Sequence, residues 1–166
     1  MATAPATAAT PRAPESAALK AGSTLMTLGG VAFIAYAVWF LVRNFTGGFL
    51  ELGIGPEQVN VGRDQIQHFS PSLLHYISHL HIAVAGFVAA TGLAAALLAW
   101  HGVRRGHMWA WTSAVLVPVV GLAIALPAHY PYGFATIGHL GLIYLATAIF
   151  VVGTGVALKG LIDQRR

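Results

Sequence analysis

Histidine is the residue type with the most chemical potential in this chain, and its placement along the sequence is uneven. His75 and His79 are four residues apart, so on a helix they would share one face about a turn from each other. His129 and His139 follow later, at the two ends of a short connection between apolar runs. Neutral imidazole is the commonest metal ligand in proteins, and it also binds haem iron. These four side chains therefore predict a histidine-ligated centre.

Two kinds of cofactor fit these residues. A single transition metal (copper, zinc or iron) would be held by His75, His79, His129 and His139, whereas a single haem b would use His75 or His79 opposite His139. This plan is similar to that of the four-helix b-type cytochromes of bacterial membranes. Those with two haems carry a second histidine deeper in the same helices, which this chain lacks, so any haem would be single. Such a centre indicates redox chemistry on a lipid-soluble substrate.

The histidines also have a simpler interpretation. Imidazoles at a membrane interface bind lipid head groups, water or one another, and two histidines four residues apart are common by chance. The pair lacks the adjacent glutamate of the HExxH zinc-hydrolase motif. The carboxylates that could join a centre from the preceding loop are Glu51, Glu57 and Asp64. His81 lies roughly 200° from His79 on a helix, so it is predicted to point away from the site.

The elements that hold these residues are predicted to lie in a membrane. Hydrophobic residues make up 57% of the 166 residues and charged residues only 8%, whereas a soluble domain of this size has about 25% charged residues. The chain has no cysteine, which excludes disulfides, thiolate metal sites and a cysteine nucleophile. Its formal charge of +4 does not indicate nucleic-acid binding, because at most two basic residues are adjacent.

Four apolar runs predict the fold, an all-α integral membrane protein built as an up-down bundle of four transmembrane helices. Each run can cross the roughly 30 Å hydrocarbon layer at about 1.5 Å per residue, and only a helix satisfies its backbone groups internally in lipid. The predicted spans are residues 23–43, 72–101, 108–127 and 136–159. Residues 1–22, rich in Ala, Thr and Pro, are predicted to form a disordered tail before the domain at 23–166.

Basic residues predict the orientation of this bundle. Seven of them lie in the tail, between the second and third spans, and at the C-terminal end, whereas the other side carries Arg43 and Arg63. The positive-inside rule then places both termini in the cytoplasm and the long loop 44–71 outside, with the four histidines near the outer face. The frequent use of Ala, Gly, Val and Arg is typical of a GC-rich prokaryotic genome. We therefore expect a multi-pass protein of a bacterial or archaeal plasma membrane.

Small residues predict where helices meet. Gly86, Ala90 and Ala94 repeat every four residues along one face of the second span, which would allow close approach of a neighbouring backbone. This pattern supports an alternative function, a non-catalytic membrane subunit or scaffold that binds a partner subunit or a second copy of itself in the lipid bilayer. A small oligomeric transporter is a second alternative, although the apolar runs contain no Asp, Glu, Lys or Arg to mark an ion path.

Prolines predict three local features. Ser70 and Pro71 favour a helix start, with Ser70 as N-cap and Pro71 at the first helical position. Pro118 in the middle of the third span favours a kink. The segment 56–69, which begins with a proline, is long enough for a short interfacial helix.

Overall fold

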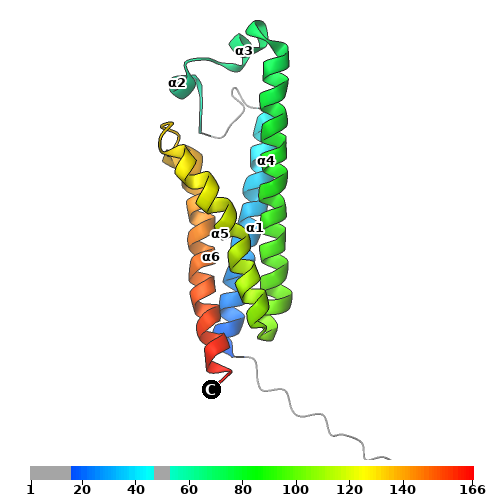
Figure 1. Ribbon diagram of the computed structural model, residues 1–166, viewed down its shortest axis with the longest axis vertical. Coiled ribbons are helices and arrows are strands. Elements are labelled where there is room, and N and C mark those ends of the chain that lie inside the picture. The colour runs from blue at the N-terminus through cyan, green and yellow to red at the C-terminus, as the bar shows by residue number, and fades with distance from the viewer. Residues whose placement is uncertain (1–15, 47–52) are drawn as a thin grey trace, which may run out of the picture.

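The computed structural model of the chain describes residues 16–46 and 53–166, and the regular structure of these residues is entirely helical (Figure 1). The four long helices are α1 (Ala17–Thr46), α4 (Pro71–Leu97), α5 (Met108–His129) and α6 (Ile137–Asp163). Two short helices, α2 (Pro56–Val59) and α3 (Arg63–Phe69), lie between α1 and α4. A π-helical turn, η1 (Leu98–Gly102), and a 3₁₀ turn, η2 (Val103–Arg105), extend α4 at its C-terminal end.

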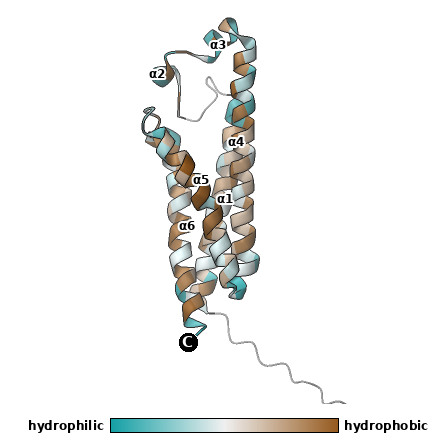
Figure 2. Ribbon diagram, viewed as in Figure 1, coloured by the Kyte–Doolittle hydropathy of each residue, from teal (hydrophilic) through white to brown (hydrophobic). Residues whose placement is uncertain are grey.

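The four long helices are each long and apolar enough to cross a membrane. They alternate in direction, and the start of α1 lies at the same end of the bundle as the end of α6 (Figure 1). The middle of the bundle is apolar, and hydrophilic residues concentrate toward the helix ends and in α3 (Figure 2). The predicted all-α four-helix transmembrane bundle is confirmed. The end of the bundle that carries α2, α3 and the α5–α6 connection is called the outer end, and the opposite end is called the inner end.

Helix α1 packs along both α4 and α6, and small residues make these contacts close. A Cβ added to Gly30 of α1 would lie 2.7 Å from the carbonyl oxygen of Gly92 in α4. On the other side of α1, a Cβ added to Gly153 of α6 would lie 2.6 Å from the backbone nitrogen of Met26. Lipid provides no hydrophobic drive between helices, so van der Waals contact at such close approaches holds the bundle together.

The small-residue face predicted for the second span is not one of these contacts. Gly86 and Ala90 are exposed, and a Cβ added to Gly86 would have no atom within 4 Å. The buried face of α4 instead includes Ala85 and Gly92, which are seven residues apart. The prediction that Gly86 and Ala90 contact a neighbouring helix of the same chain is therefore wrong. A repeat of small residues does not by itself identify which side of a helix faces the bundle.

Helix α5 is the least buried of the four long helices. In its most apolar 18-residue window 17% of the residues are buried, against 33% in α1 and in α6. Its contacts with α6 are sparse, whereas it packs on α4 and on η1 at the inner end. Figure 1 shows α5 crossing the bundle obliquely, so that its outer end lies well apart from α4. Pro118 is buried in the middle of this helix.

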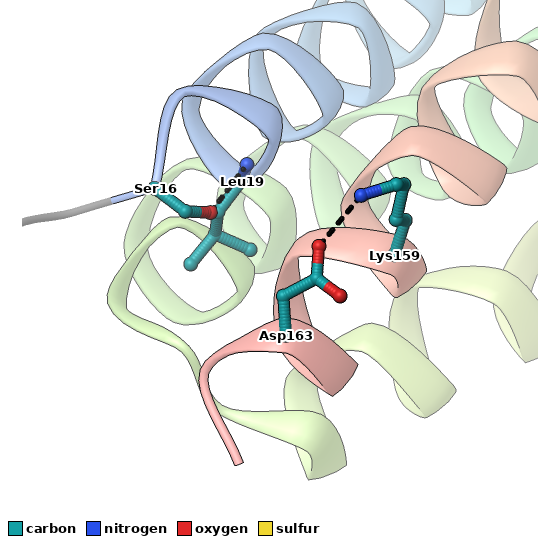
Figure 3. Close-up of polar contacts among 4 residues, drawn as sticks. All are labelled: Ser16, Leu19, Lys159 and Asp163. Atoms are coloured by element: carbon teal, nitrogen blue, oxygen red, sulfur yellow. Dashed lines mark hydrogen bonds and ion pairs between the residues drawn. The ribbon is translucent and has the colours of Figure 1, made fainter. Parts of the chain in front are cut away.

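The start of α1 differs from the predicted start of the first span. Ser16 Oγ accepts a hydrogen bond of 3.1 Å from the backbone N–H of Leu19, which is fully buried (Figure 3). Such an N-cap satisfies one of the free N–H groups of the first helical turn. Helix α1 therefore begins at Ala17, and residues 17–22, assigned to the tail from the sequence, form its first turns. Residues 1–15 lie outside the described part of the chain.

The connection between α1 and α4 carries the short helices. The interfacial helix predicted within 56–69 consists of two pieces, α2 and α3, which are separated at Asn60 with its left-handed φ of 59°. Ser70 then caps α4 by accepting a backbone N–H three residues later, and Pro71 occupies the first turn. The predicted start of this helix is confirmed. Residues 47–52 lie outside the described residues.

Candidate functional site

Two histidines from different helices meet at the outer end of the bundle. The ring centroids of His129, at the end of α5, and His139, in the first turn of α6, are 4.9 Å apart, and the rings are tilted by 38°. The turn between the helices allows this approach, since Gly133 adopts a left-handed φ of 74°. Thr136 then caps α6 by accepting the backbone N–H of His139. The structure thus brings together two of the four histidines singled out in the sequence.

His129 is oriented by its own helix. Its Nδ1 lies 2.7 Å from the carbonyl oxygen of Ala125, one turn earlier. Because a carbonyl oxygen only accepts hydrogen bonds, Nδ1 must carry a proton, which in a neutral imidazole leaves the lone pair on Nε2. Histidines that ligate metals are commonly oriented in this way, by donating their other ring N–H to a backbone carbonyl. His129 is therefore preorganised to bind a metal or a hydrogen-bond donor through Nε2.

His139 is more enclosed than His129. It is only 2% exposed, whereas His129 is partly exposed. Gly53, just before α2, contributes to this cover, because a Cβ added there would overlap the Gly138 carbonyl carbon and lie 2.5 Å from the His139 backbone nitrogen. The φ of 68° at Gly53 also favours glycine. The connection between α1 and α4 is thus seated directly on the first turn of α6.

A pocket of about 280 Å³ lies beside the histidine pair, and both imidazoles are among its lining residues. All four long helices contribute to its walls, which are aliphatic and aromatic apart from the histidines and the hydroxyls of Tyr36 and Thr91. Phe87 of α4, 76% exposed, and the exposed Gly121 of α5 stand at its rim. These exposed lining residues indicate that the pocket opens between α4 and α5, within two of the candidate membrane spans.

Among the histidines of α4, His81 faces the bundle and His75 and His79 do not. The ring of His81 meets Phe40 of α1 edge-on, with centroids 5.4 Å apart, and Phe40 also lines the pocket. His75 and His79 are exposed. On a helix, His81 lies about 40° from the buried Ala85, whereas His79 lies about 120° from it. Helix α4 is apolar on all sides, so the spacing of its apolar residues gave no signal that could assign these faces.

The histidine pair could supply two nitrogen donors to a metal ion. Within residues 16–46 and 53–166, no three His, Cys, Asp or Glu side chains are grouped closely enough to hold a metal ion. Glu57 of α2 and Asp64 of α3 are exposed. Glu51, the third carboxylate considered from the sequence, lies outside the described residues. Within the described residues, a metal bound by His129 and His139 would have no third His, Cys, Asp or Glu ligand.

A polar contact that was not predicted from the sequence joins α1 to α4 one turn beyond Phe40. Asn44 is fully buried and donates through Nδ2 to Ser78 Oγ at 2.8 Å. The backbone carbonyl of Asn44 accepts a hydrogen bond of 2.9 Å from Arg63 of α3, which ties the outer connection to the last turn of α1. The sequence feature that could have identified Asn44 is its position four residues after Phe40, which places it on the same inward face of α1.

No protein-family model matches this chain, and no curated protein or solved structure is significantly similar to it.

Proposed function

We propose that the protein binds one transition-metal ion near its outer membrane face through His129 and His139. The observation that carries this proposal is the 4.9 Å approach of two imidazoles from different helices. Imidazole suits copper, zinc and iron, and copper(II) binds a given site of nitrogen donors more tightly than the other divalent first-row ions. Two protein ligands leave several positions open, as expected of a reactive metal rather than of a closed structural site.

The geometry favours a bare metal ion over haem b. Imidazoles on opposite faces of a haem iron have ring centroids about 6 Å apart, since each metal–nitrogen bond is about 2 Å and each ring adds about 1 Å. The observed 4.9 Å corresponds instead to neighbouring positions around one ion. The pocket of about 280 Å³ also lies at the lower end of the range for ligand sites, roughly 300–1,000 Å³, and is small for a porphyrin.

Redox chemistry on a lipid-soluble substrate, indicated by the sequence, remains part of this proposal. Copper or iron held by the pair would lie beside an apolar pocket that opens toward the lipid. A molecule dissolved in the membrane would reach the metal without crossing the aqueous phase. The apolar lining supports this route, because charged substrates would lose their hydration on entry.

The test is metal uptake by the purified protein. The protein in detergent is stripped with EDTA, equilibrated with Cu²⁺ or Zn²⁺, desalted and submitted to elemental analysis. We expect one ion per chain at neutral pH and loss of the ion below about pH 6, because protonated imidazole cannot ligate a metal. His129→Ala and His139→Ala should each abolish retention of the ion.

Exposed histidines of the same protein provide matched controls. His75→Ala and His79→Ala should retain the metal, because both side chains lie on the exposed face of α4, and so should His101→Ala at the inner end. Loss of metal in the His75 or His79 variant would instead support the four-histidine set predicted from the sequence. Failure of the wild-type protein to take up a stoichiometric ion would refute the metal centre.

We further infer that the bundle lies in a prokaryotic plasma membrane with its inner end in the cytoplasm. The charge pattern supports this, and at the inner end the Arg104 guanidinium lies 4.3 Å from the centroid of the Trp100 ring, a combination of residues typical of membrane interfaces. A reporter fused after Gly106 should be active in the cytoplasm, and one fused after Glu57 should be active outside. The reverse result would place the histidine pair at the cytoplasmic face.

A non-catalytic membrane subunit or scaffold is the second candidate function. The exposed face formed by Gly86 and Ala90 favours it, because small residues on a lipid-facing surface permit close packing of another helix. That helix would belong to a second copy or to a partner subunit. If so, Gly86→Leu should dissociate an oligomer seen by cross-linking in membranes, while the metal content should be unchanged.

A further inference from the structure

We infer that the pocket binds the hydroxyl-bearing aromatic head group of a lipid-soluble molecule, of the class of alkylphenols and quinols, which enters from the bilayer between α4 and α5. This inference goes beyond the proposed metal centre, because it concerns the pocket walls and His129 in the metal-free protein. Three features support it: the route of access, the shape and lining of the pocket, and the hydrogen-bonding state of His129.

The route of access leads from the lipid. On the outer side, His139 is 2% exposed and Gly53 is packed against its backbone. On the lateral side, Phe87 and Gly121 at the rim are exposed within the spans, and α5 is the least buried helix. A ligand would therefore arrive from the membrane, which requires a molecule that is mostly apolar.

The walls favour an aromatic head group of one ring. Phe33, Tyr36 and Phe40 of α1 and Phe87 of α4 line the pocket, and aromatic rings pack favourably on one another in offset or edge-to-face geometry. An apolar cavity of about 150 Å³ already holds a benzene ring, so a volume of about 280 Å³ accommodates one substituted ring together with the first part of its tail. An alkyl or isoprenoid tail would then pass through the opening between α4 and α5 into the surrounding lipid.

The hydrogen-bonding state of His129 selects a hydroxyl on that ring. Its Nδ1 already donates to the Ala125 carbonyl at 2.7 Å, so in the neutral imidazole Nε2 is an acceptor. An O–H group of a phenol or quinol satisfies this acceptor, whereas the carbonyl oxygen of a quinone and the oxygen of a methyl ether cannot. The two classes of ligand therefore differ by one hydrogen bond to His129.

The test compares a phenol with its methyl ether, in which a methyl group replaces the hydrogen that the hydroxyl would donate. Metal-stripped protein is incubated with 4-decylphenol or with its methyl ether, 4-decylanisole, and the bound ligand is counted by native mass spectrometry from detergent micelles. We expect 4-decylphenol to bind about five- to tenfold more tightly, as one hydrogen bond implies. In His129→Phe, which keeps the ring but removes the acceptor, the two probes should bind equally.

A pair of glycine substitutions tests the place of binding. Gly121 lines the pocket at its exposed rim, and a Cβ added there would have no atom within 4 Å, so Gly121→Leu should obstruct the opening of the pocket without disturbing the fold. Gly155→Leu is the matched control, because Gly155 also has open space around it but lies outside the pocket. We expect 4-decylphenol binding to be lost in the first variant and kept in the second.

The outcomes separate this inference from the metal centre. Gly121→Leu should keep stoichiometric metal uptake at His129 and His139 while it loses 4-decylphenol, so either property can fail alone. Equal binding of the phenol and the ether by the wild-type protein would overturn the role of His129. Unchanged 4-decylphenol binding in Gly121→Leu would overturn the pocket as the binding site.

Discussion

Helices α1 and α5 both pack against α4, yet one interface is closed and the other opens into a pocket. At the α1 interface, a Cβ added to Gly92 would lie 2.5 Å from the carbonyl oxygen of Gly30. Toward α5, Gly121 lines the pocket and a Cβ added there would meet no atom within 4 Å. Both residues are glycines, but Gly92 is in close backbone contact with a neighbouring helix and Gly121 has open space around it. Glycine in a transmembrane helix thus indicates either a close backbone contact or a space.

The two interfaces also differ in what they can do. Backbone contact between α1 and α4 leaves no room for a ligand and fixes the two helices relative to each other. The looser α5 carries His129 beside the cavity, while α6, held firmly by α1, presents His139. A site between a firmly held helix and a loosely held one combines a histidine in a fixed position with an opening through which a second molecule can enter.

The largest effect is expected where the backbones are in contact. Gly92→Leu should lower the stability of the bundle by more than about 3 kcal/mol or prevent folding, because the new side chain meets the Gly30 carbonyl, which cannot move without shifting α1. The measurement is thermal unfolding of the purified protein in detergent. Gly86→Leu on the same helix is the control, and its melting temperature should stay close to that of the wild type. Similar losses in both variants would mean that Gly86 also lies at a packed interface.

A smaller effect is expected at the polar contact that joins α1 to α4 near the outer end. Asn44→Ala removes the 2.8 Å hydrogen bond to Ser78 and should cost about 1–2 kcal/mol in the free energy of unfolding. Ser78→Ala removes the same bond from the other side. If loss of this hydrogen bond accounts for the destabilisation, the double variant should be only slightly less stable than the less stable of the two single variants. Additive losses would show that the two side chains act separately.

The sequence was sufficient for most of the fold and for the end of the bundle at which His129 and His139 meet. Apolar run length gave four spans, and Ser70 with Pro71 gave the start of α4, because span length and capping chemistry are local properties. That His129 and His139 lie at the same end of the bundle also followed from their positions at the ends of two spans. These features need no knowledge of how the helices pack.

The faces of the helices and the pocket could not be predicted in the same way. On a helix apolar all round, the side that meets the bundle is set by the neighbours. Gly86 was therefore assigned to a contact that Gly92 makes, and His81 was predicted to point away from the site although it faces the bundle. The pocket is lined by residues of all four long helices, so it depends on tertiary packing that no local sequence pattern reveals. Asn44 was missed because its partner Ser78 is distant in sequence.

The smallest effect is expected outside both interfaces, at the inner end of α6. Lys159 Nζ and Asp163 Oδ2 form an ion pair of 2.7 Å, but their side chains are 72% and 45% exposed (Figure 3). Water and salt screen such a pair, and holding two flexible side chains together costs entropy, so exposed pairs contribute little. The order is also unfavourable, because the acidic residue lies nearer the negative end of the helix dipole.

Lys159→Ala should therefore leave the melting temperature in detergent unchanged within error, at low and at high salt. Ser16→Ala at the same end of the bundle is the contrasting variant, because it removes the cap on the Leu19 N–H (Figure 3) and should cost about 1 kcal/mol. A clear loss of stability in Lys159→Ala that disappears at high salt would mean that the inner end is held by charge. The contrast between the closed α1 interface and the open α5 interface would then not be enough to explain the stability of the bundle.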